Sequence, residues 1–322
     1  MNPPILSFII VNWNTKHLLC DCIQTILDTT DHISSEIIVV DNASRDGSPA
    51  EVKNTFPQVL LLAQSENRGF ACGVNAGIRA AKGQNFVILN PDICFQRDTM
   101  TTLLNFLTGH PDVGVVTPRL VNKAGTVRSG YTRKLPSTMQ IVLFHSALAP
   151  WSEKQSWLVR RYLEEQRNTR GESTDVEQIP GAFMVVPRHV VETVGLMDEG
   201  FGLFFEDVDW SYRIRRAGFR LCEVSNATAI HIGGQSFQRP DNYWMFGRFV
   251  ASALRFFDIH YSRFSAYVLR ALMVFNSIAV FGMTFILKKN DSVLMTRRKH
   301  KYFLRLMWAR YLQGKEISLA VS

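Results

Sequence analysis

Phe86-Val87-Ile88-Leu89-Asn90-Pro91-Asp92 has the pattern of a short buried strand that stops at a carboxylate. Pro91 stiffens the turn after the four apolar residues, so Asn90 and Asp92 can point the same way. In an α/β sheet, ligands sit at the carboxyl ends of the strands. A carboxylate there can hold a hard divalent cation and leave positions open for substrate phosphates. Taken alone, an ordinary turn is the simpler interpretation, so the surrounding sequence decides between them.

Strand and helix patterns alternate before this stretch. Ile5–Val11, Glu36–Val40 and Val59–Leu62 are apolar runs of strand length, and the first is apolar enough to be covered on both faces. Leu18 to about Asp28 carries apolar residues at helical spacing, and Ala71–Ala81 has the composition of a small-residue helix. This β-α-β-α-β-α-β alternation predicts a nucleotide-binding sheet with right-handed crossovers.

Polar residues follow these strands. Asp41 ends the second strand opposite Asn12, where it can accept hydrogen bonds from a base or a ribose hydroxyl. A turn or a helix cap is the simpler role for Asp41. Asn67, Gly69 and Asn75 make the next loop-to-helix junction small and rich in amides, which suits a backbone close to a phosphate or a sugar. Tight helix packing would explain the glycine equally well.

An acidic cluster, Glu206-Asp207-Val208-Asp209, follows the aromatic run Phe201–Phe205. Carboxylates beside apolar rings repel one another and have raised pKa values. A raised pKa helps a general base to collect a proton near neutral pH. First-turn acids that complement a helix dipole are the alternative, and Asp209, one turn before Arg213, fits that role well. Asp207 fits it less completely.

One histidine stands out by its position. His231 lies between a strand-like run and the glycines Gly233 and Gly234. A lone histidine is more often a satisfied core residue than a ligand. A neutral imidazole can also complete a metal shell begun by Asp92, so the residues alone leave both interpretations open.

Composition bounds the class of protein. The 322 residues, 46% hydrophobic and 11% aromatic, indicate a folded globular chain rather than a disordered one. Five cysteines without a CxxC pair predict neither a disulfide framework nor a zinc site. The start of the chain lacks the basic region of a signal peptide, so we expect a cytoplasmic protein.

The net charge of +8 is concentrated at one end. From Lys288 to Ser322, nine lysines and arginines oppose two acids, so the rest of the chain is almost neutral. A neutral body argues against a nucleic-acid partner, and we expect no nucleic acid. A basic tail behind an apolar run suggests an anionic membrane surface.

The chain changes character after Pro240. Tyr243–Phe264 is aromatic, and Ala271–Leu287 is a run of 17 residues without a charge, which is short for a spanning helix. The alternatives are a buried soluble helix or an interfacial helix with the basic cluster Arg297–Lys301 on anionic lipid. We favour attachment, because a lone spanning helix would put the basic tail on the wrong side of the membrane.

Four ordered motifs resemble those of family 2 glycosyltransferases, and most of all their rhamnosyltransferase branch. They are Ser7-Phe8-Ile9-Ile10-Val11-Asn12-Trp13-Asn14, Val39-Val40-Asp41-Asn42-Ala43-Ser44 with Asp46-Gly47-Ser48, Asn67-Arg68-Gly69-Phe70 and Asn90-Pro91-Asp92. The resemblance covers roughly residues 5–240. It implies an α/β protein with the GT-A fold, a Rossmann-like mixed sheet flanked by helices, here followed by a C-terminal membrane-associated helical segment.

The resemblance also implies roles for individual residues. Asn90 departs from the acid that often begins the family's metal motif, so Asp92 is the only anionic ligand there and metal affinity should be lower. Asp207 matches the family's catalytic base. We expect the remaining contacts as follows: nucleotide-sugar binding by Val11, Asn12, Asp41, Asn67, Gly69, Asn75 and Asn90, binding of Mg²⁺ or Mn²⁺ by Asp92 and His231, and acceptor binding by Glu206, Asp209 and Trp210.

Three regions are expected along the chain. Residues 1–118 would form a nucleotide-sugar-binding half, and residues 119–240 the acceptor-binding and catalytic half of the same GT-A domain. Residues 241–322 would form a helical membrane-associating region with a basic tail. Within the second half, Arg119–Gln178 has no clear pattern, and either a loop over the acceptor or a surface insertion would explain it.

The expected function is that of a metal-dependent, inverting hexosyltransferase on the cytoplasmic face of the inner membrane. It would move a sugar, best matched by rhamnose from dTDP-rhamnose, from a nucleotide-sugar to a saccharide or lipid-linked acceptor in cell-surface polysaccharide synthesis. A nucleotidyltransferase is one alternative, but it would need a basic glycine-rich loop where Asn12–Thr15 stands. A non-catalytic, membrane-bound saccharide-binding protein is the other.

Overall fold

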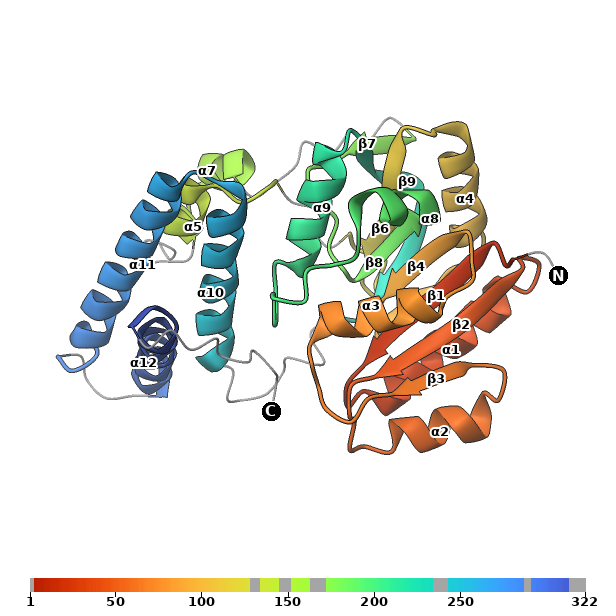
Figure 1. Ribbon diagram of the computed structural model, residues 1–322, viewed down its shortest axis with the longest axis horizontal. Coiled ribbons are helices and arrows are strands. Elements are labelled where there is room, and N and C mark those ends of the chain that lie inside the picture. The colour runs from red at the N-terminus through yellow and green to blue at the C-terminus, as the bar shows by residue number, and fades with distance from the viewer. Residues whose placement is uncertain are drawn as a thin grey trace.

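The structure is a computed structural model that describes residues 3–127, 134–144, 152–162, 172–233, 243–286 and 291–312. A mixed sheet with flanking helices forms one part, and three long C-terminal helices form a layer beside it (Figure 1). This confirms the expected α/β architecture. Three stretches of Arg119–Gln178, namely 128–133, 145–151 and 163–171, lie outside the described residues, as do Gly234, Lys288, Lys289 and the basic tail after Leu312.

The first half of the sheet is parallel. Its elements are β1 (Leu6–Asn12), α1 (Lys16–Thr29), β2 (Ser35–Asp41), α2 (Ser48–Thr55), β3 (Leu60–Ala63), α3 (Phe70–Ala80) and β4 (Asn85–Leu89). The strands lie in the order β3-β2-β1-β4, with every pair parallel. The order therefore switches direction between β1 and β4, and ligands bind at such a switch point in open α/β sheets.

The second half extends the same sheet. Its elements are β5 (Ile93–Phe95), α4 (Thr99–Gly109), β6 (Val113–Val121), α5 (Thr138–Phe144), α7 (Ser156–Tyr162), β7 (Ser173–Asp175), β8 (Phe183–Pro187), α8 (Arg188–Val194), α9 (Glu206–Arg216) and β9 (Arg220–His231). β8 runs antiparallel to β4, and the full order is β3-β2-β1-β4-β8-β6-β9-β5, with β7 paired to β9. The sheet is therefore mixed, as expected.

Apolar layers cover both faces of β1. Phe8 and Ile10 belong to one buried cluster, and Ile9 and Val11 belong to another that includes the buried face of α3. This two-sided burial explains why the strand is apolar throughout. A Cβ on Gly73 would lie 2.7 Å from Val11 Cγ1, so this glycine lets α3 lie directly against β1.

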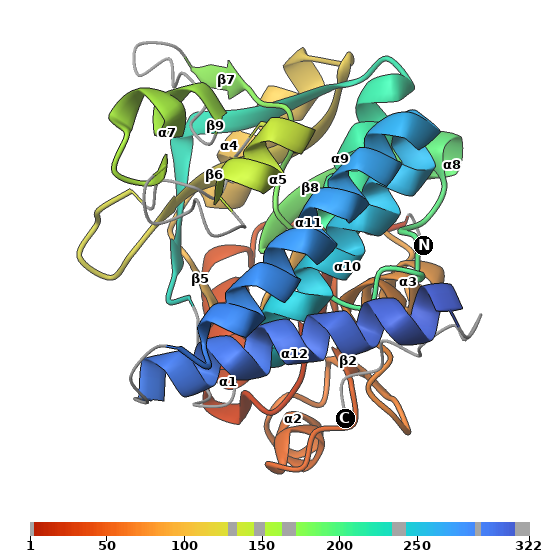
Figure 2. The ribbon, with the colours of Figure 1, turned by 90° about the vertical axis from the view of Figure 1, so that its left-hand side faces the viewer.

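The helical layer consists of α10 (Tyr243–His260), α11 (Arg263–Met283) and α12 (Asp291–Leu312). α12 crosses over the other two helices (Figure 2). A third apolar cluster holds the layer together and takes in Phe201 and Phe205 from the loop before α9. The helical layer is thus packed onto the loop that carries the acidic cluster.

Within the described part of the chain, α11 is the one helix long and apolar enough to cross a membrane. Its most apolar stretch has a mean hydropathy of 1.6, and only 22% of it is buried. A narrow seam of Ala266, Leu269, Met273 and Ser277 packs inward. Large side chains on the rest of the surface are exposed, including Phe264 at 75% and Phe275 at 73%.

Candidate active site

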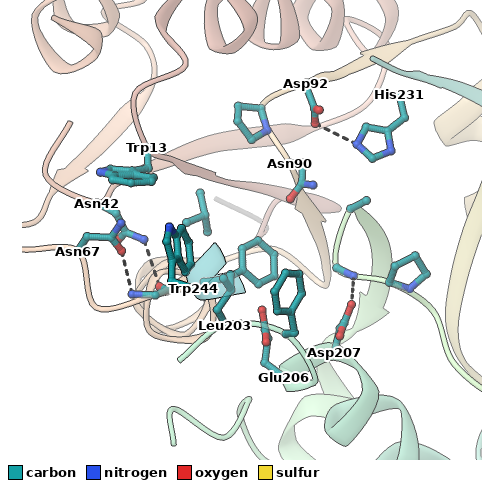
Figure 3. A pocket seen from close by; sticks show the side chains of 18 residues that line it. Trp13, Asn42, Asn67, Asn90, Asp92, Leu203, Glu206, Asp207, His231 and Trp244 are labelled. Atoms are coloured by element: carbon teal, nitrogen blue, oxygen red, sulfur yellow. Dashed lines mark hydrogen bonds and ion pairs between the residues drawn. The ribbon is translucent and has the colours of Figure 1, made fainter. Parts of the chain in front are cut away.

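A pocket of about 360 Å³ opens at the switch point of the sheet. Its walls come from the ends of β1, β4 and β9, the loop before α3, the turn before β8, and the starts of α9 and α10 (Figure 3). Eight of the residues expected from the sequence line it: Val11, Asn67, Gly69, Asn90, Asp92, Glu206, Asp207 and His231. Segments that are far apart in the chain therefore converge on one cavity.

Strand pairing brings Asp92 and His231 together. β5 pairs antiparallel with β9 so that Ile93 lies opposite His231. Asp92 Oδ1 lies 3.1 Å from His231 Nε2, and Asp92 Oδ2 accepts a hydrogen bond from the backbone N–H of Gly233 at 3.0 Å. Both side chains are almost buried. The register of β5 against β9 thus fixes the carboxylate of Asp92 beside the imidazole of His231 on the pocket wall.

These two residues fit a divalent metal. Neighbouring ligand atoms on an octahedral ion lie about 3 Å apart, as the carboxylate oxygen of Asp92 and the imidazole nitrogen of His231 do. Within the described ranges, no group of three or more His, Cys, Asp or Glu side chains is gathered into a metal site. A metal held by Asp92 and His231 alone would keep open positions for substrate oxygens, as expected for Mg²⁺ or Mn²⁺ at a diphosphate.

Glu206 and Asp207 lie elsewhere on the wall of the same pocket (Figure 3). Asp207 Oδ2 accepts from the N–H of Gly181 at 2.9 Å, and its Oδ1 accepts from the N–H of Val208 at 2.9 Å. Burial raises the pKa of both carboxyl groups, and the charge of Asp207 raises that of Glu206 further. The sequence-based expectation of acids with raised pKa values is met at both positions.

The two acids differ in their hydrogen bonds. Backbone N–H groups that donate to Asp207 favour its anion, because a carboxylate is stabilised by such donors. Glu206 Oε2 is buried and has no hydrogen-bond partner among the described residues. Of the pair, Glu206 therefore holds a proton more readily, and Asp207 ionises more readily.

Backbone strain precedes these acids. Phe204 and Phe205 have φ angles of 65° and 70°, which is costly for aromatic residues. Packing compensates, because the Phe205 ring lies 5.2 Å from the ring of Phe249 on α10 and Ser252 donates to the carbonyl of Leu203 at 2.9 Å. The helical layer therefore holds the acidic cluster in place.

Asp41 and Asn12 are not among the residues that line the pocket. Asp41 accepts from Asn12 Nδ2 and from the N–H of Ser44, both at 2.8 Å. Asn42 donates to the carbonyl of Gly69 at 3.1 Å, which ties the loop after β2 to the loop before α3. These bonds shape the pocket, and direct contact of Asp41 or Asn12 with a nucleotide stays a prediction.

Comparison with known proteins identifies the family. The family model for Glycosyl transferase family 2 matches residues 7–189, more than half of the chain. The chain belongs to glycosyltransferase family 2. The N-acetylglucosaminyl-diphospho-decaprenol L-rhamnosyltransferase of Mycobacterium tuberculosis is 26% identical over 206 residues, 61% of this chain and 66% of that relative. A hexosyltransferase of low-salt glycan biosynthesis from Haloferax volcanii is 23% identical over 230 residues, 70% and 66% of the two chains.

Solved structures share the fold of this family 2 chain. A mannosyltransferase from Pyrobaculum calidifontis in complex with GDP-Man and Mn²⁺ aligns with a TM-score of 0.53 at 16% identity, over 95% of this chain and 87% of that chain. GalNAc-T7 with UDP, GalNAc and Mn²⁺ aligns with a TM-score of 0.59 at 15% identity, over 97% and 57%. The GT-A architecture expected from the motifs is therefore confirmed.

Three residues expected at the site have partners elsewhere in this family 2 chain. Asn75 donates to Met197 O and Glu199 Oε1, each at 2.9 Å. Asp209 accepts from Arg213 Nε at 2.8 Å and lies 2.6 Å from His260 Nε2, while Trp210 is fully buried and donates to a backbone carbonyl. The pocket wall includes neither Asn75, Asp209 nor Trp210, so binding of a nucleotide-sugar or an acceptor by them stays a prediction.

Several pocket residues of the family 2 chain were not expected. Trp13 and Asn42 lie inside the family motifs, and each directly follows a residue that was predicted to bind the nucleotide-sugar. The motifs therefore already indicated both positions. The backbone N–H of Gly181 orients Asp207 from 26 residues away, and no local pattern indicates this contact. Trp244 comes from α10, and nothing in its own sequence neighbourhood indicates that α10 reaches the pocket.

Proposed function

We propose that this protein is an inverting glycosyltransferase that moves a sugar from a nucleoside-diphosphate sugar to a hydroxyl of a saccharide or lipid-linked acceptor. One observation carries the proposal. The carboxylate–imidazole pair of Asp92 and His231 and the ionisable Asp207 line a single pocket at the switch point of a family 2 chain. This arrangement supports a metal–diphosphate site and a general base on either side of a reacting sugar.

The proposed chemistry divides the work between these residues. When bound, a divalent metal held by Asp92 and His231 would offset the charge that develops on the leaving diphosphate. Asp207 takes the proton from the acceptor hydroxyl, whose oxygen attacks the anomeric carbon on the face opposite the leaving group. A single displacement of this kind inverts the anomeric configuration. Protonated Glu206 spares Asp207 the repulsion of a second charge.

Rhamnose is the first donor sugar to test. The Mycobacterium tuberculosis relative is named for transfer of L-rhamnose to N-acetylglucosaminyl-diphospho-decaprenol, a saccharide on a lipid diphosphate. dTDP-rhamnose and a lipid-linked acceptor are therefore our proposal for this chain, in cell-surface polysaccharide synthesis. Mn²⁺ accompanies the nucleotide in both solved relatives and is the first metal to test, with Mg²⁺ as the second.

Membrane attachment is part of the proposal. The exposed face of α11 carries Phe264, Tyr267, Phe275 and Ile278. Large apolar side chains gathered on one exposed face are typical of a surface that contacts a membrane or another protein. α12, which packs against α11, carries several basic residues, as suits the anionic cytoplasmic face of an inner membrane. We therefore propose that the helical layer attaches the enzyme to that face without spanning the membrane.

A donor screen tests the function. Purified protein is incubated with dTDP-rhamnose, UDP-sugars and GDP-mannose, and release of the nucleoside diphosphate is measured with Mn²⁺, with Mg²⁺ and with EDTA. We expect one donor to be consumed in the presence of metal and spared in EDTA. Turnover that is equal in EDTA would contradict the metal assignment, and no turnover of any donor with a lipid-linked saccharide present would favour the non-catalytic alternative.

A further inference from the structure

α12 carries basic residues on a side away from its apolar contacts. Arg298, Lys301, Tyr302 and Arg305 recur at the spacing that puts side chains on one side of a helix. The three cationic residues are exposed. Residues on another side of the same helix, including Phe303 and Met307, are buried in the apolar cluster of the helical layer.

This basic face forms the wall of a second hollow, of about 660 Å³, between α12 and the start of α10. Tyr243 and Trp244 of α10 complete the wall. The described lining therefore holds three cations, two phenols and an indole, and no carboxylate. Arginine and lysine with hydrogen-bonding aromatic side chains are suited to phosphate groups, which accept several charge-assisted hydrogen bonds at once.

Close packing between α10 and α12 shapes the hollow. A Cβ on Gly247 would lie 2.6 Å from Cδ1 of Tyr302, so this glycine allows α12 to pack closely against α10. The rings of Tyr243 and Tyr302 meet edge to face with centroids 6.0 Å apart. These contacts fix Tyr302, and with it the turn of α12 that carries Lys301 and Arg305.

Trp244 connects the hollow to the catalytic pocket, because it lines both. A ligand whose anionic group lies against α12 is thus separated from the Asp207 pocket by the thickness of one side chain. α11, with its exposed apolar face, packs against α12 on the helical layer. Trp244 is therefore shared by the pocket and the hollow, and α12 is shared by the hollow and the contact with α11.

We propose that the hollow between α10 and α12 binds the diphosphate of a lipid-linked acceptor. The saccharide extends past Trp244 toward Asp207, and the lipid chain runs toward α11. This inference rests on the proposed function and specifies its acceptor class. Three cations suit the charge of a diphosphate, but an anionic lipid headgroup carries the same phosphate chemistry, so the test separates these two sources.

The test measures binding of farnesyl diphosphate to the full-length protein by calorimetry in detergent with EDTA, so that no metal holds a diphosphate in the catalytic pocket. Arg298→Gln/Arg305→Gln removes two cations from the hollow. Lys299→Gln is the control, because it removes one charge from the same helix at a position that does not line the hollow. We expect the dissociation constant to rise roughly tenfold or more in the double variant and to stay within about twofold in the control.

Other outcomes would overturn the proposal. Equal affinity in the double variant, or an equal loss in Lys299→Gln, would mean that general positive charge attracts the probe. A double variant that keeps farnesyl diphosphate but no longer binds phosphatidylglycerol vesicles would assign the hollow to lipid headgroups. Binding of the nucleoside diphosphate with Mn²⁺ reports separately on the catalytic pocket, so its absence in the parent would contradict the proposed function and leave the farnesyl diphosphate result standing.

Discussion

His260 Nε2 lies 2.6 Å from Asp209 Oδ1, which joins the last turn of α10 to the first turn of α9. Arg255 makes a second link from α10 by pairing with Asp198 at 2.7 Å. The acids Glu206 and Asp207 begin α9. The helical layer is therefore tied directly to the helix that carries the proposed catalytic base. Asp209 thus helps to hold α9 against α10, and its contact with an acceptor stays a prediction.

Asp209→Asn should lower stability without affecting the nucleotide site. Burial acts to raise the pKa of Asp209, but the hydrogen bond from His260 and the charge of Arg213 hold it below its ordinary value. A depressed folded-state pKa contributes stability above the unfolded value of about 3.9, and this contribution is lost as pH falls through the folded value. The variant should therefore lose roughly 1–3 kcal/mol at pH 7 and lose progressively less toward pH 3.

Urea unfolding of parent and variant at several pH values measures this difference. Nucleoside diphosphate binding with Mn²⁺ should stay the same in both. A variant as stable as the parent at pH 7, but defective in acceptor use, would restore Asp209 to the acceptor site.

His231→Gln should weaken metal activation of the enzyme. Removing one of two protein ligands should raise the Mn²⁺ concentration for half-maximal turnover by roughly 10- to 100-fold, the range seen when metal-site partners are lost. Asp92→Asn should do at least as much, because it removes the anionic ligand. The measurement is nucleoside diphosphate release against Mn²⁺ concentration.

His189→Gln is the matched control for the metal test, since His189 lies on α8 and does not line the pocket. An unchanged Mn²⁺ requirement in His231→Gln would make His231 a core residue held by Asp92.

Local sequence patterns predicted the elements whose residue types follow from their own burial. β1 and β4 were recognisable because strands buried on both faces must be apolar throughout, and Asp92 because a polar residue follows a buried strand directly. The role of Asn75 was not readable in the same way, and that of Asp209 only in part, because the spacing showed Arg213 one turn later but not His260. Their partners Glu199 and His260 are 124 and 51 residues away, and sequence spacing cannot indicate such contacts.

For the same reason, the sequence did not predict the outer wall of the pocket. Trp244 lines the same pocket as Asp207 because α10 packs on the loop at Leu203 and Phe205. The two segments have no common sequence pattern from which this contact could be predicted. Trp210 makes another contact of this kind, because its buried indole donates to the carbonyl of Gly195, 15 residues away.

Phe275→Glu should release the protein from membranes. Phe275 is 73% exposed on the apolar face of α11, and burying a phenylalanine in an apolar phase contributes about 1.5–3 kcal/mol. Replacement by a charge should weaken partitioning into phosphatidylglycerol vesicles roughly tenfold or more, measured by flotation. Leu60→Glu is the control, because Leu60 is an exposed apolar residue on β3 at 45%.

Equal release by Leu60→Glu would show that the effect is general charge repulsion. A parent protein that does not float with vesicles would contradict attachment through α11 altogether.

Asp207→Asn should separate an enzyme from a binding protein. The amide keeps the size of the side chain but cannot accept the proton of the acceptor hydroxyl, and general base catalysis contributes roughly 10²–10⁴ in rate. Turnover should fall by that factor while the affinity for the nucleotide-sugar stays near that of the parent. Glu206→Gln should retain most turnover at pH 7, because the structure indicates that Glu206 already carries a proton there.

The pH profile gives a second test of the same assignment. Burial raises the pKa of Asp207, and a base works only when ionised, so parent turnover should fall as pH drops through a value above that of an ordinary aspartate. The acid limb should be absent from the residual activity of Asp207→Asn. Near-parent turnover in Asp207→Asn together with its loss in Glu206→Gln would move the base to Glu206, whose higher pKa would then shift the acid limb toward neutral pH.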